Sequence, residues 1–135
     1  MESIISGSCL CGGVKFTLNN TFKRFYFCHC KQCQKITGSA HVANLFTSPD
    51  NIQWTSGAAL TKRYEYPDRS FTKVFCTQCG CGLPFINKSG QALIVPAGCL
   101  DGEPTIQPSD NIFWSERASW YDLGVKANHC DGFPE

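Results

Sequence analysis

Apolar and polar side chains alternate over short stretches of this chain, and each stretch ends at residues that favour turns. Residues 13–18 alternate in this way and end at Asn19-Asn20, and residues 22–27 are rich in aromatic side chains. Successive side chains of a strand point to opposite faces, so a period of two with aromatic or β-branched residues indicates a β-strand. We predict strands at residues 13–18, 22–27, 40–46, 52–55, 61–66, 70–75, 83–86 and 92–95.

The last two predicted strands flank Asn87-Lys88-Ser89-Gly90, a turn sequence that predicts a hairpin. Helical signal is scarce, with one or two turns expected from about His29 to Ile36. Many short strands separated by turns are typical of a mainly β fold with little helix. At 135 residues the chain suits one domain, residues 1–135, with a tail after Asp101 that extends over the surface.

Charge and hydropathy narrow the possible partners. The net charge is +1, which provides no large field for nucleic acid or anionic lipid, so neither is expected as a partner. The first ten residues carry an acid at Glu2 and no basic or long apolar stretch, and no segment approaches the roughly 20 apolar residues that span a bilayer. We therefore expect a cytoplasmic protein, in a reducing compartment where clustered thiols bind metal more often than they form disulfides.

Ten cysteines change this picture most. Eight of them fall in three tight sequence clusters: Cys9 and Cys11; Cys28, Cys30 and Cys33; and Cys76, Cys79 and Cys81. Cys76 and Cys79 are separated by two residues and followed by Gly80, which is the spacing of a zinc knuckle. Cys9 and Cys11 would supply the other two ligands, since the glycines after them let the backbone curl and bring both sulfurs inward. We predict a closed structural zinc site at these four cysteines; a redox disulfide between Cys76 and Cys79 is the alternative.

The middle cluster offers three thiols, Cys28, Cys30 and Cys33, and no obvious fourth. Three protein ligands with one open position are typical of a catalytic zinc. A zinc with three thiolates suits the binding of a further thiolate, which would stay deprotonated and able to attack an electrophilic carbon. In the alternative, a fourth ligand closes the site, and the candidates are His29, His41, Cys81, Cys99, His129 and Cys130.

Four stretches carry a resemblance to a known family: residues 7–14, 28–39, 73–80 and 96–101. In the order CxC, CxCxxC and CxxCG, they resemble the glutathione-dependent formaldehyde-activating enzyme family, also named for centromere protein V. The resemblance implies small antiparallel sheets in a tent-like, zinc-stabilised fold. It also implies two Zn²⁺ ions, one structural at Cys9, Cys11, Cys76 and Cys79 and one catalytic at Cys28, Cys30 and Cys33.

The activity that the resemblance implies joins glutathione to formaldehyde, giving S-(hydroxymethyl)glutathione by carbon–sulfur lyase chemistry. Our leading hypothesis is therefore a zinc enzyme that adds a small thiol, such as glutathione, to an aldehyde carbon or releases it. A non-catalytic zinc module that binds a protein partner is the competing hypothesis, and it predicts no cavity beside Cys30. Cations available to offset the metal centres or to hold substrate carboxylates are Lys23, Arg24, Lys31, Lys35, Arg63 and Lys73.

Overall fold

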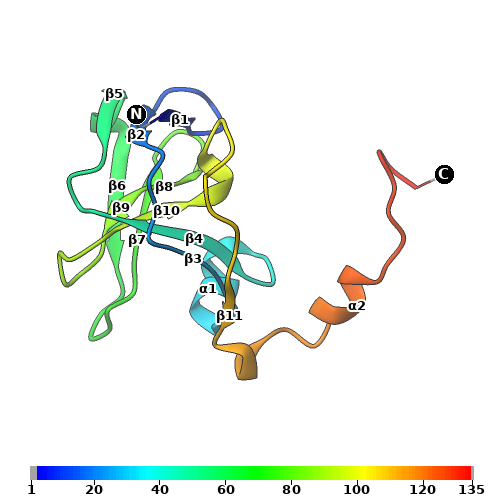
Figure 1. Ribbon diagram of the computed structural model, residues 1–135. Coiled ribbons are helices and arrows are strands. Elements are labelled where there is room, and N and C mark those ends of the chain that lie inside the picture. The colour runs from blue at the N-terminus through cyan, green and yellow to red at the C-terminus, as the bar shows by residue number, and fades with distance from the viewer. Residues whose placement is uncertain (1–2, 135) are drawn as a thin grey trace.

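The computed structural model describes residues 3–134, and its element order agrees with a mainly β fold (Figure 1). Its short strands are joined by turns, one two-turn helix and several single turns of helix. The prediction of a mainly β fold of small sheets with little helix is confirmed. In chain order the elements are β1 Ile4–Ser8, β2 Lys15–Asn19, β3 Arg24–Cys28, α1 Lys31–Thr37, β4 Val42–Thr47, β5 Gln53–Ser56, η1 Ala58–Leu60, β6 Thr61–Glu65, β7 Thr72–Cys76, β8 Gly82–Leu83, β9 Phe85–Ile86, β10 Leu93–Pro96, η2 Ala97–Cys99, β11 Asp110–Ile112, η3 Trp114–Glu116 and α2 Tyr121–Val125.

The strands form three small sheets, in the orders β1-β2-β5, β11-β3-β4-β10-β9 and β6-β7-β8. All strand pairs are antiparallel except β11 with β3, which run parallel. The inward faces of the sheets meet in one core that includes Phe16, Leu45 and Val95, all at most 1% exposed. An isolated antiparallel bridge joins Gly7 of β1 to Leu100, just after η2.

The predicted hairpin is present, but the strand predicted at residues 83–86 is divided. Pro84, which is fully buried, separates β8, paired with β7, from β9, paired with β10. Proline has no backbone N–H to donate to a ladder, so the chain changes sheets at this residue. The two short strands thereby connect the β6-β7-β8 sheet to the five-stranded sheet, and the site described below lies beside this connection.

Part of the tail after Asp101, which is expected to be partly extended over the surface, joins a sheet. Its β11 adds an edge strand beside β3, with Ile112 paired to Cys28. Beyond Tyr121, the first residue of α2, the chain leaves the sheets and projects from the body of the molecule (Figure 1). Leu123 and Phe133 in this arm are 71% and 97% exposed. Within residues 3–134, no helix is long and apolar enough to cross a membrane.

Candidate metal centres and active-site pocket

The first cysteine cluster brings together two turns that are far apart in the sequence. Cys9 and Cys11 follow β1, while Cys76 ends β7 and Cys79 lies in the turn after it. The four sulfur atoms all lie within 4.8 Å of one another, with 3.5 Å between Cys9 and Cys11 and 3.9 Å between Cys11 and Cys76. Four sulfurs around a tetrahedral zinc, with bonds of about 2.3 Å, lie about 3.8 Å apart. The donor set and its spacing therefore fit a zinc ion.

Each turn directs backbone N–H groups at its sulfurs. Val14 donates its N–H to Sγ of Cys9 over 3.2 Å, and Gln78 donates its N–H to Sγ of Cys76 over 3.4 Å. Gly12 and Gly80 have φ of +77° and +76°, a left-handed conformation that side chains beyond glycine rarely adopt. A backbone N–H from Cys11 lowers the pKa of Cys79 to about 6. The contacts of Cys9 and Cys79 lower the pKa of both thiols and so favour the thiolate forms that bind metal, whereas the pKa of Cys11 is raised to about 11.

The second cluster is built where β3 meets α1. Cys28 is the last residue of β3, Cys30 is the N-cap of α1, and Cys33 lies in its first turn. The N–H of Cys33 donates to Sγ of Cys30 over 3.4 Å, and the three sulfurs lie within 4.8 Å of one another. A hydrogen bond with Cys33 lowers the pKa of Cys28 to about 6, and the same contact raises the pKa of Cys33. Three thiols so placed also have a donor set that fits zinc.

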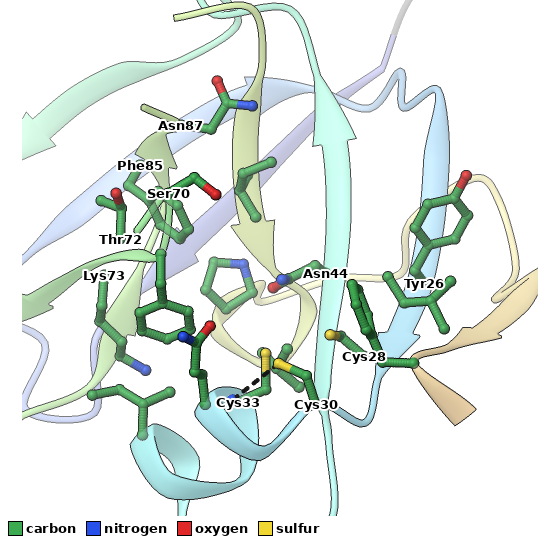
Figure 2. A pocket seen from close by; sticks show the side chains of 18 of the residues that line it. Tyr26, Cys28, Cys30, Cys33, Asn44, Ser70, Thr72, Lys73, Phe85 and Asn87 are labelled. Atoms are coloured by element: carbon green, nitrogen blue, oxygen red, sulfur yellow. Dashed lines mark hydrogen bonds between the residues drawn. The ribbon is translucent and has the colours of Figure 1, made fainter. Parts of the chain in front are cut away.

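A pocket of about 510 Å³ lies beside the second cluster (Figure 2). Cys28, Cys30 and Cys33 all line it, whereas none of the four cysteines of the first cluster does. Its volume lies in the range of small-molecule sites. The walls are largely apolar, with side chains that include Phe46, Phe71, Phe85 and Ile94.

Charged side chains also reach this pocket. Lys31, Arg69 and Lys73 line it with a single acid, Glu116, among its described residues. Glu116 accepts the backbone N–H of Lys31 over 3.1 Å. Burial lowers the pKa of Lys73, while the neighbouring charges of Cys81, Cys33 and Cys99 oppose that change. The pocket is therefore suited to an anionic or polar ligand with apolar parts.

His29 lies between two of the thiols but its ring is held away by other contacts. It is fully buried, and its Nε2 is 2.9 Å from Oδ1 of Asn111 on β11. The rings of Tyr121 and Trp114 lie 4.8 and 5.1 Å from it, edge to face. Gln34 donates its side-chain N–H both to the carbonyl of His29 and to that of Glu116. The segment 111–121 thus covers the turn that carries the second cluster.

Sequence reasoning missed this covering segment. Asn111 is 82 positions from His29, and nothing in its neighbours along the chain marks it as a partner. Within residues 3–134 the second cluster comprises three metal-binding side chains. The candidates for a fourth ligand lie outside it: His29, His41, Cys81, Cys99, His129 and Cys130.

The cysteines outside the clusters differ in exposure. Cys99 is 6% exposed, and burial raises its pKa to about 12. Burial also raises the pKa of Cys81, which donates its thiol hydrogen to the carbonyl of Gly82. Cys130 is exposed in the projecting arm. None of the ten cysteines forms a disulfide, so Cys76 and Cys79 stand as separate thiols.

Comparison with known proteins agrees with the two clusters. Residues 4–116 match the model of a family described as glutathione-dependent formaldehyde-activating enzyme. A crystal structure of a Rhodobacter sphaeroides protein has a similar fold, with a TM-score of 0.61 and 21% sequence identity over 74% of this chain and 91% of that chain. No curated protein matches the chain. The family match covers most of the chain and every cysteine of both clusters, so this protein belongs to the glutathione-dependent formaldehyde-activating enzyme family.

Proposed function

We propose that this protein is a zinc enzyme that joins glutathione to formaldehyde, or separates them, in the pocket beside Cys28, Cys30 and Cys33. The observation that carries the proposal is the three-thiol cluster that opens into a cavity large enough for a small thiol. The family description names both glutathione and formaldehyde. A wholly structural zinc module is not favoured, since it predicts no cavity beside Cys30 and Cys30 lines one.

The two clusters would hold zinc ions with different roles, one structural and one catalytic. Cys9, Cys11, Cys76 and Cys79 would hold a structural zinc ion, because four thiols close a tetrahedral site. Cys28, Cys30 and Cys33 would hold a second zinc at the pocket wall, with a place left for a ligand. Zinc in that place would lower the pKa of a substrate thiol and so favour its thiolate near neutral pH.

The reaction itself is an addition of the thiol to the aldehyde. A bond forms between sulfur and the carbon of formaldehyde, the carbonyl π bond breaks, and the thiol proton ends on the new hydroxyl oxygen. The pocket residues bring the two reactants together, which lowers the entropic cost of their meeting. Apolar side chains such as Phe46 and Phe71 limit the water around the reacting sulfur.

The test measures how fast glutathione and formaldehyde exchange with their adduct, by magnetization-transfer NMR at equilibrium, together with zinc per chain. Zinc-loaded protein is expected to accelerate exchange and to contain two zinc ions. Cys30→Ser is expected to abolish the acceleration and to reduce zinc to one per chain. Cys130→Ser, an exposed cysteine outside both clusters, is the matched control and should behave as the unaltered protein. Zinc-loaded protein that neither binds glutathione nor changes the exchange rate would contradict the proposal.

A further inference from the structure

Lys73 presents a positive charge in the pocket for which the protein provides no acidic partner. Among residues 3–134, the ion pairs are Arg63 with Glu65 and Arg117 with Asp122, and Lys73 takes part in neither. The acid that lines the pocket, Glu116, accepts the backbone N–H of Lys31 at Oε1 and is in neither ion pair. We propose that the ammonium group of Lys73 binds a carboxylate of the thiol substrate and selects thiols that carry a carboxylate over neutral ones. This inference rests on the function proposed above.

The backbone leaves a place for this side chain. Lys73 lies on β7, and its amine lies against Gly82 of the neighbouring β8, where a Cβ would be 2.8 Å from Nζ and 3.3 Å from Cε. Any side chain at residue 82 would displace the amine. Figure 2 shows the Lys73 side chain reaching along the pocket, with its nitrogen toward the end where Cys30 and Cys33 lie.

The place of the amine suits a ligand that also reaches the thiols. Lys73 and all three cysteines of the second cluster line the same cavity. A thiol whose sulfur lies at that cluster and whose carboxylate is a few bonds away would reach from one group to the other. An ammonium that is half-buried without a carboxylate partner carries a desolvation cost, and a bound carboxylate would reduce that cost with a charge-assisted hydrogen bond.

A competing role for Lys73 is that of counter-ion to the cysteine cluster alone. Three thiolates with one zinc carry a net negative charge, and Cys33 lies near enough to influence Lys73 electrostatically. The two roles predict different results. A counter-ion acts on every thiol and on the metal itself, whereas a carboxylate-binding group acts only on ligands that have a carboxylate.

The experiment compares glutathione with 2-mercaptoethanol, a thiol without a carboxylate, as ligands of the zinc-loaded full chain. Binding constants are measured by calorimetry for the unaltered protein, Lys73→Met and Lys73→Arg. Lys73→Met is expected to weaken glutathione about 10- to 100-fold and to leave 2-mercaptoethanol and the two zinc ions per chain unchanged. Lys73→Arg should retain most of the affinity. Lys62→Met, exposed on β6 and outside the pocket, is the control and should change neither ligand.

Two results would overturn the inference while the proposed function stands. In one, Lys73→Met binds glutathione as the unaltered protein does. In the other, it weakens both thiols equally or loses zinc, which is the behaviour of a counter-ion. If the unaltered, zinc-loaded protein binds neither thiol, the proposed function fails and the inference fails with it.

A second measurement needs no variant, so it can overturn the inference even if Lys73→Met does not fold. Glutathione is compared with its diethyl ester on the unaltered protein. The ester is expected to bind about 10-fold or more weakly, because it lacks the carboxylate charge. Equal affinity for the acid and the ester would overturn the inference.

Discussion

Gly7 has no side chain, and this allows β1 to lie against the ring of Phe16. A Cβ at residue 7 would overlap that ring and would lie 2.9 Å from the carbonyl oxygen of Cys99. Phe16 is 1% exposed and the carbonyl belongs to the backbone, so neither neighbour can move away at low cost. The position therefore requires glycine for reasons of space.

Gly7→Ala is expected to lower the free energy of unfolding by about 1–3 kcal/mol, as overpacking of a filled core does. Equilibrium unfolding in urea, followed by tryptophan fluorescence, measures the change. Gly98→Ala is the matched control, because a Cβ there meets nothing within 4 Å, and it should alter stability by less than about 0.5 kcal/mol. Equal stability of the Gly7→Ala and unaltered proteins would show that β1 moves away from Phe16.

Individual residues differ in how far the sequence could identify them. The grouping of the cysteines was predictable, because chelate spacing is local and CxC, CxCxxC and CxxCG each occupy a single turn. The contacts that other residue types make around the second cluster and the pocket were not predictable, because they come from distant parts of the chain. Asn111 reaches His29, and Gly82 makes room for Lys73, only through the fold.

At the scale of elements, most strands lie close to predicted ranges, whereas β1 and β11 were not predicted. The strands β2, β3, β4, β6 and β7 lie close to the predicted ranges. By contrast, β11 consists of Asp110, Asn111 and Ile112, two of which belong to residue types depleted in strands. It is a strand because β3 offers it an open edge, and tertiary pairing of that kind leaves no local pattern.

The hydrogen bond between β11 and His29 provides a test of this element. Asn111→Leu removes the acceptor at 2.9 Å and leaves a buried Nε2 without a partner. The free energy of unfolding is expected to fall by about 1–3 kcal/mol. The affinity of the second zinc should fall as well, since His29 lies between two of its proposed ligands. Competition with a chromogenic chelator measures that affinity.

Asn111→Asp keeps an oxygen acceptor in the same place and is expected to restore most of both properties. Asn128→Leu, at an exposed position in the projecting arm, is the matched control and should change neither. If Asn111→Leu binds the second zinc as tightly as the unaltered protein, the contact between β11 and His29 does not orient the cluster.

At the scale of the whole molecule, the first cluster ties two sheets together. Cys11 and Cys76 are 65 positions apart, and they lie beside β1 and at the end of β7, in different sheets. A link that closes a loop of this length removes chain entropy worth on the order of 4 kcal/mol from the unfolded state. The second cluster closes only a short turn within one segment. Loss of metal from the two clusters should therefore have different consequences for the fold.

Removal of zinc by a chelator is expected to proceed in two steps. The first zinc should leave from Cys28, Cys30 and Cys33, because that site has three protein ligands and opens into the pocket. Far-UV circular dichroism should then stay unchanged. The zinc at the four-cysteine cluster, of which Cys9 and Cys76 are 3% and 0% exposed, should leave last, and unfolding should accompany its loss.

A metal-binding dye and circular dichroism, recorded on the same sample, separate these steps. Cys76→Ser is expected to abolish the second, slower release of zinc and to produce a chain that is largely unfolded. Cys30→Ser should abolish the first, faster release of zinc and keep the fold. A single phase in which both metals and the secondary structure disappear together would contradict the division into a structural and a catalytic site. That division would leave the pocket-facing cluster free to exchange ligands while the sheets around it stay in place.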